Sequence, residues 1–129
     1  MTYAAYTKTQ NRTTESPRDI EYRLLGAVTA ALLEAESNPQ VVNRMEAVCW
    51  NRDVWGALRM DINHPENALP QAIKDNLLGL AGWVHKETTR ILRGETDELD
   101  GLISVNKNIM DGLKPKGRKA PNDGVIQGN

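Results

Sequence analysis

Apolar side chains recur at spacings of three and four residues along the middle of the chain, which is the period of an α-helix. The first such run is Ile20, Leu24, Val28, Leu32 and Ala35. Ser16 is a favourable N-cap before it, and Pro17 suits the first helical position. The pattern therefore predicts a helix of about 20 residues that begins after Ser16.

Three more helices are predicted after this one. The Ser37-Asn38-Pro39 link is short enough to make the next helix an antiparallel neighbour, with Asn38 as its cap and Pro39 at its first position. Its apolar face contains Val41, Val42, Met45, Val48, Cys49, Trp55 and Leu58. A linker over Asp61–Leu69 separates it from a third helix over Pro70–Arg93, which Gly94 ends.

The fourth helix is predicted from about Thr96, a suitable cap with Asp97 and Glu98 in the first turn. Its apolar side is Leu99, Leu102, Ile103, Ile109, Met110 and Leu113. No segment alternates with the two-residue period of a strand. The predicted fold is all-α: a small bundle of about four helices over residues 16–113, a flexible N-terminal arm over 1–15 and a disordered basic tail over 114–129.

Composition narrows the class of protein. The net charge is −1, so no global field attracts nucleic acid or an anionic membrane. No apolar run approaches the length of a membrane span, and the first residues lack the apolar stretch of a secretory signal. The single cysteine, Cys49, cannot form an intramolecular disulfide and fits a reducing compartment. We expect a soluble cytoplasmic protein that does not insert into a membrane.

The sequence offers few groups that could carry out catalysis. His64 and His85 belong to no metal-ligand pair, and the chain has no phosphate-binding loop. Cys49 lies within a predicted apolar face, where a thiol usually behaves as an inert small hydrophobe, so pairing with His85 as a nucleophile and base is not expected. The acidic run Glu95–Asp100 lacks the spacing of a calcium loop. We expect no enzyme activity, no metal and no cofactor.

The tryptophans and the basic tail are the remaining candidates for function. All three tryptophans lie within 50–84 of a chain without phenylalanine. Trp55 and Trp83 fall on or beside apolar stripes, which favours packing, whereas Trp50 lies at the edge of a stripe and fits either core or interface. Four cations near the C-terminus could contact RNA, although a solvated tail is favoured because no aromatic side chain accompanies them. They are Lys114, Lys116, Arg118 and Lys119.

The linker and its flanks carry a family resemblance. The pattern is Asn51-Arg52, Trp55, Leu58, Asp61, Pro65, Asn67, Leu69-Pro70 and Trp83-Val84. It resembles the FlaF family of bacterial flagellar biosynthesis regulators, and the similarity extends over about Tyr3–Arg93. The resemblance implies a non-enzymatic cytoplasmic factor needed for flagellin production and export, working opposite the translational repressor FlbT.

Three functions are compatible with this resemblance. The leading hypothesis is an export chaperone that holds an amphipathic terminal helix of flagellin in an apolar groove. The alternatives are a post-transcriptional regulator of flagellin mRNA, acting with FlbT or by direct RNA contact, and an adaptor in the export machinery. The candidate partner-binding residues are Trp50, Asn51, Trp55, Asp61, Asn67, Leu69, Pro70 and Trp83.

Overall fold

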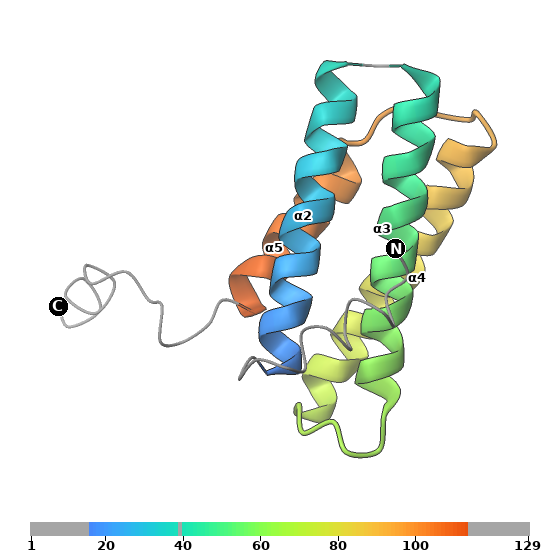
Figure 1. Cartoon of the computed structure of the whole chain (residues 1–129). Coiled ribbons are helices and arrows are strands. Elements are labelled where there is room, and N and C mark those ends of the chain that lie inside the picture. The colour runs from blue at the N-terminus through green and yellow to red at the C-terminus, as the bar shows by residue number, and fades with distance from the viewer. Residues whose placement is uncertain (1–15, 39, 114–129) are drawn as a thin grey trace, which may run out of the picture.

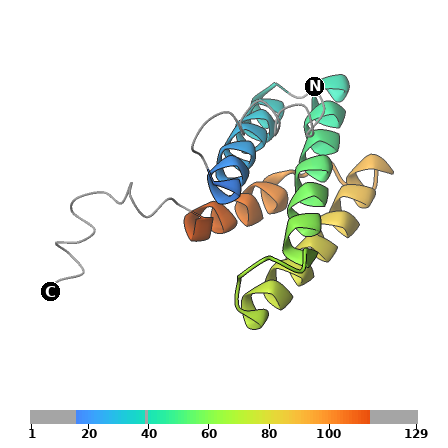
Figure 2. The ribbon, with the colours of Figure 1, turned by 60° about the horizontal axis from the view of Figure 1, so that its bottom comes forward.

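The part of the chain that the structure describes is a bundle of four helices, as the sequence predicts. A computed structural model describes residues 16–38 and 40–113, and no strand occurs in those ranges. The helices are α2 (Pro17–Ser37), α3 (Val41–Asn63), α4 (Gln71–Leu92) and α5 (Asp100–Leu113). α3 lies between α2 and α4 and packs along both, whereas α5 packs obliquely across α2 (Figures 1 and 2).

The start of α2 is fixed by a reciprocal cap. The Asp19 N–H donates to Ser16 Oγ at 3.2 Å, and the Ser16 N–H donates to Asp19 Oδ2 at 3.4 Å. Both bonds satisfy amides that have no partner inside the helix. The prediction of Ser16 as the cap and Pro17 in the first turn is confirmed.

The junction between α2 and α3 differs from the prediction. Asn38 is the C-cap of α2, because its N–H donates to the Glu34 carbonyl at 2.9 Å. It therefore cannot serve as the N-cap of α3. That position belongs to Gln40, which makes no side-chain capping bond, while Pro39 lies outside the described residues.

The linker between α3 and α4 is shorter than expected. α3 continues to Asn63, into the predicted linker, and α4 begins at Gln71 with Pro70 as its N-cap. Ile62 is buried in the core, which accounts for the continuation of α3 beyond Asp61. Gly94, with φ of +77°, follows the end of α4 as predicted.

The prediction that α5 starts at about Thr96 is wrong. The Thr96 hydroxyl accepts from the Glu98 N–H at 3.2 Å, a local turn that competes with helix formation. Leu99 is buried in the core before the helix starts, and its carbonyl accepts from the Ile103 N–H. The helix therefore begins only at Asp100, after the connection has delivered Leu99 to the core.

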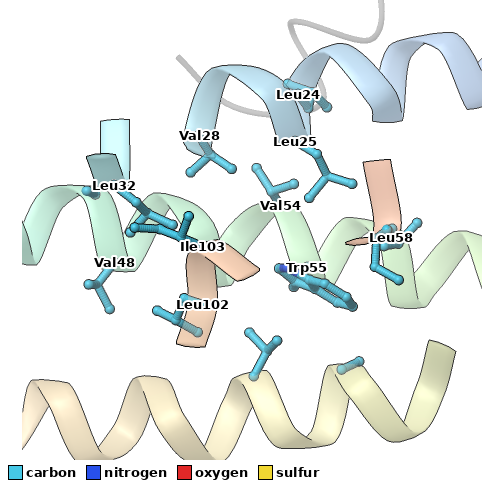
Figure 3. Packing of buried hydrophobic residues seen from close by; sticks show 14 of the residues in the cluster. Leu24, Leu25, Val28, Leu32, Val48, Val54, Trp55, Leu58, Leu102 and Ile103 are labelled. Carbon is cyan, nitrogen blue, oxygen red and sulfur yellow. The ribbon is translucent and has the colours of Figure 1, made fainter. Parts of the chain in front are cut away.

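The core lies where the inner faces of all four helices meet, with Trp55 among aliphatic side chains (Figure 3). Burying one such side chain contributes roughly 1.5–3 kcal/mol. The large aliphatic residues that are most completely buried are Leu25, Val28, Leu32, Val48, Val84, Ile91, Leu99 and Leu102. This shared core sets which helix faces remain at the surface.

Two predicted regions lie outside the described residues: the N-terminal arm over 1–15 and the basic tail over 114–129. The predictions for these regions, including RNA contact by the tail, stay predictions. Within the described ranges, no helix has the length and apolar character needed to cross a membrane.

Candidate functional site

A buried polar network joins three helices at the centre of the bundle. Asn106 of α5 accepts from the Trp55 indole N–H at 2.8 Å. Its side-chain amide donates to Asn51 Oδ1 at 2.7 Å and to Thr29 Oγ1 at 3.1 Å. The Thr29 hydroxyl donates in turn to the Leu25 carbonyl at 2.6 Å. These bonds fix the position of α5 against α2 and α3.

Two of the predicted partner-binding residues belong to this network. Asn51 is 0% exposed and therefore closed off from the surface, whereas Trp55 is 3% exposed and reaches solvent only through a small part of its ring. Their geometry indicates a structural role, because buried polar groups need partners and these two find them in Asn106. One polar atom of the network, Asn51 Nδ2, has no acceptor among the described residues.

The linker residues shape the turn between α3 and α4. The Asn67 side-chain amide donates to the Asp61 carbonyl at 3.0 Å, and Asn67 Oδ1 accepts from the Leu69 N–H at 3.0 Å. Leu69 is half-buried against the core, and Pro70 is exposed at the start of α4. Asn67 thus holds the turn closed so that Leu69 covers the end of the bundle.

Asp61 also meets a carboxyl group from α2. Glu21 is buried, and its pKa is raised to about 9 by desolvation, by a hydrogen bond with the Asp61 side chain and by the Asp61 charge, while Arg18 opposes the shift. A protonated Glu21 can donate to the Asp61 carboxylate, whereas two charged carboxylates would repel. The pair therefore holds the first turns of α2 against the last turns of α3 when Glu21 carries its proton.

Trp50 and Trp83 are both partly exposed. Trp50 is 39% exposed on α3, which supports the interface alternative for this residue. Trp83 is 41% exposed, so its prediction as a packed core residue is wrong in part. One edge of its ring still packs on α5, since a Cβ added to Gly101 would lie 2.9 Å from Trp83 Cη2. The helical stripe identified its helix face, but α5 covers only one edge of that face.

A cavity of about 150 Å³ lies between α3 and α4. Its floor is buried and mainly apolar, and its rim is exposed and carries cationic and imidazole groups. The floor is Trp55, Ala81 and Val84, and the rim is Arg52, Gly56, Arg59 and His85. None of these lining residues is acidic. The cavity is therefore open to solvent and suited to an anionic group with an apolar stem.

The outer face of α3 beside this cavity exposes a large apolar side chain near each end of the helix. Val42, Cys49 and Gly56 are seven residues apart, and Met60 follows Gly56 by one turn, so all four share one face of the helix. The exposed acids Glu46 and Asp53 lie on the same face. Val42 is 66% exposed and Met60 is 75% exposed. Large apolar side chains that stay exposed in the folded chain are candidate contacts for another protein.

The candidate site differs from the one that the sequence predicts. Sequence reasoning missed the rim residues Arg52, Gly56 and Arg59, although their spacing of four and three residues already placed them on one edge of α3. It could not find His85 as their neighbour, because that depends on how α4 packs against α3. Among the described residues, no group of three or more His, Cys, Asp or Glu side chains could hold a metal ion.

Comparisons with known proteins give one match. The family model described as flagellar protein FlaF matches residues 2–113. No curated protein and no solved structure matches the chain.

Proposed function

The chain belongs to the FlaF family of flagellar proteins, and from this premise we propose that it is a non-enzymatic export chaperone that binds flagellin in the cytoplasm. Its flagellar role follows from the family. Flagellin as the partner and chaperoning as the activity are the proposal, and the experiment below tests them.

The observation that supports binding to another protein is the exposure of two large apolar side chains on the outer face of α3. Val42 and Met60 are the most exposed large apolar side chains of the described ranges, and they lie on one face of a helix whose opposite face is in the core. A folded protein gains nothing in its own stability from apolar side chains left in water. A partner that covers them would gain their burial, at roughly 25 cal/mol per Å².

A terminal helix of flagellin has the character that this face requires. Such helices are amphipathic and pair fully only in the assembled filament, so before export their apolar sides are unpaired. Laying one of them along α3, beside α4, would bury both apolar surfaces by helix-in-groove packing. The chaperone would thereby keep flagellin from premature association.

Calorimetry with the full chain and separate N-terminal and C-terminal flagellin fragments tests this proposal. We expect one fragment to bind with a negative heat-capacity change, which is the mark of apolar burial. A Met60→Ser variant should bind more weakly, whereas Gln71→Ser, an exposed change at the start of α4, should bind normally. Absence of binding by the unaltered chain at about 50 µM would refute the proposal.

The second candidate function is control of flagellin mRNA, directly or through FlbT. It is supported by the basic cluster Lys114, Lys116, Arg118 and Lys119 in the sequence. If it is right, deleting residues 114–129 should abolish retention of flagellin mRNA and flatten the salt dependence of binding. A gel shift that persists after the deletion, or none with the intact chain, would contradict direct RNA contact by the tail.

A further inference from the structure

The cavity between α3 and α4 has an unbalanced charge. Arg52 and Arg59 stand on its rim, one on each side of Gly56 along α3, and His85 faces them from α4. Arg59 forms no ion pair among the described residues, and the nearest carboxylate to Arg52, that of Asp53, lies 3.9 Å from its Nε in an exposed pair. An exposed pair at that distance is weak, so both guanidinium groups are free to bind another anion.

Neither the first 15 residues nor the last 16 residues of the chain carry an excess of acidic side chains that would fit the cavity. Residues 1–15 contain Lys8 and Arg12 against the single carboxylate of Glu15, and residues 114–129 contain four cations against Asp123. Like charges would oppose the entry of either segment between the arginines. Charge complementarity therefore points to an acidic group from another molecule.

We propose that this cavity receives the carboxylate side chain of a glutamate or aspartate from the helical partner, with Arg52 and Arg59 binding the carboxylate and Trp55 supporting its stem. The inference rests on the proposed function and adds to it the residue type that is recognised. Guanidinium groups bind carboxylates through charge-assisted, often bidentate hydrogen bonds, and His85 offers a further ring N–H.

The size of the cavity agrees with such an occupant. An apolar cavity of about 150 Å³ accommodates benzene, which has six non-hydrogen atoms. A glutamate side chain has five, and its methylene groups would lie on the buried floor while the oxygens reach the rim. Gly56 lies on the rim at the entrance to the cavity, and a Cβ added to it would meet no atom within 4 Å. The entrance is therefore open on the side of α3.

The surroundings of the cavity predict a pattern in the partner. Met60 lies one turn of α3, about 6 Å, to one side of Gly56, and Cys49 lies about 10 Å to the other side. A partner helix lying along α3 would place apolar side chains over both and its acid between them. We expect an acidic residue with apolar residues about four positions away on one side and about seven on the other.

Binding of a flagellin terminal fragment to cavity variants of the full chain tests the inference. Arg52→Met with Arg59→Met removes the charges, and Gly56→Met fills the entrance without a clash at Cβ. Gly79→Met on α4 is the matched control, because Gly79 is exposed, also has open space at its Cβ and is not part of the cavity lining. Thermal unfolding of each variant shows that it is folded.

We expect the double arginine variant and Gly56→Met to bind about 10- to 100-fold more weakly, with Gly79→Met unchanged. Replacing one acidic residue of the fragment by its amide should weaken binding to the unaltered chain but not to the double arginine variant, which identifies the acid in the cavity. The decisive result is that the effects of the fragment's amide substitution and of the double arginine substitution are not additive.

Other outcomes overturn the inference in distinguishable ways. Undiminished binding by folded cavity variants would refute the cavity and leave the flagellin partner standing, whereas no binding by the unaltered chain would refute the proposed function and this inference with it. Cavity variants that lose only RNA retention would assign the site to phosphate. Variants that change the sedimenting mass of the chain would assign it to a second copy of this protein.

Discussion

Replacing Asn106 by Leu should strongly destabilise the bundle, although leucine has the same number and branching of side-chain heavy atoms as asparagine. Asn106 is 0% exposed and accepts from the Trp55 indole N–H while donating to Asn51 and Thr29. The leucine removes all three bonds. Because leucine is not smaller than asparagine, it opens no cavity, so the loss comes from the broken polar network together with the fit of the larger methyl groups.

The expected magnitude follows from the groups left behind. The Trp55 N–H and the Asn51 side-chain oxygen would both stay buried without a partner, whereas Thr29 keeps its bond to the Leu25 carbonyl. Each unpaired buried group costs about 1–3 kcal/mol, so the free energy of unfolding should fall by about 2–6 kcal/mol. Small domains have only about 5–15 kcal/mol in total.

Urea unfolding monitored by tryptophan fluorescence measures this change, provided that the slope with denaturant stays constant. Asn108→Leu is the control, since Asn108 is exposed on the same helix and should change stability by no more than about 0.5 kcal/mol. Adding Trp55→Phe, which removes the indole N–H, should cost less in the Asn106→Leu background than alone. A loss below 1 kcal/mol for Asn106→Leu, or full additivity with Trp55→Phe, would refute this account of α5.

Three further predictions concern other sites. Because the pKa of Glu21 is raised from 4.5 to about 9 in the folded state, its contribution to folding stability is complete below pH 4.5 and is lost as the pH rises to about 9. The midpoints of urea unfolding should fall over this pH range, and Glu21→Gln should flatten that decline. Parallel pH profiles for the two proteins would contradict this prediction. Trp55→Ala should lower the free energy of unfolding by about 3–5 kcal/mol, whereas Trp83→Ala should lower it clearly less because Trp83 is partly exposed. Gly101→Ala should destabilise the chain only while Trp83 is present. Calorimetric melting of the single and double variants checks both expectations. Trp50→Ala should leave stability within about 1 kcal/mol and weaken flagellin binding, and a core-sized loss of stability would assign Trp50 to packing.

The helices were predictable because their information is local. Ser16 and Pro17 mark the start of α2, and Gly94 marks the end of α4, since capping bonds and backbone angles depend on residues within one turn. The errors occurred where a local signal competed with packing. Thr96 has the chemistry of a cap, but Leu99 is drawn into the core first, so α5 begins four residues later.

The candidate site was less predictable than the fold. The linker pattern around Asp61, Asn67 and Leu69 carried the family resemblance, and the family is confirmed. The structure shows that Asn67 closes a turn in this linker, so part of the pattern reflects residues that hold the fold. Asn51 and Trp55 likewise belong to the core network, whereas Arg52, one position after Asn51, and Arg59, one turn after Trp55, form the exposed rim of the cavity.

The sequence by itself determined the four helices of the described residues, the start of α2, the end of α4 and the faces that carry apolar side chains, because the 3.6-residue period and these two helix ends depend on neighbouring positions. Only the tertiary structure decided how far α5 covers Trp83, which polar residue would pair with Trp55, and that His85 would face two arginines across Gly56. These relations join residues far apart in the chain. They depend on the angles at which whole helices cross, and those angles are set by the packing of all the side chains together.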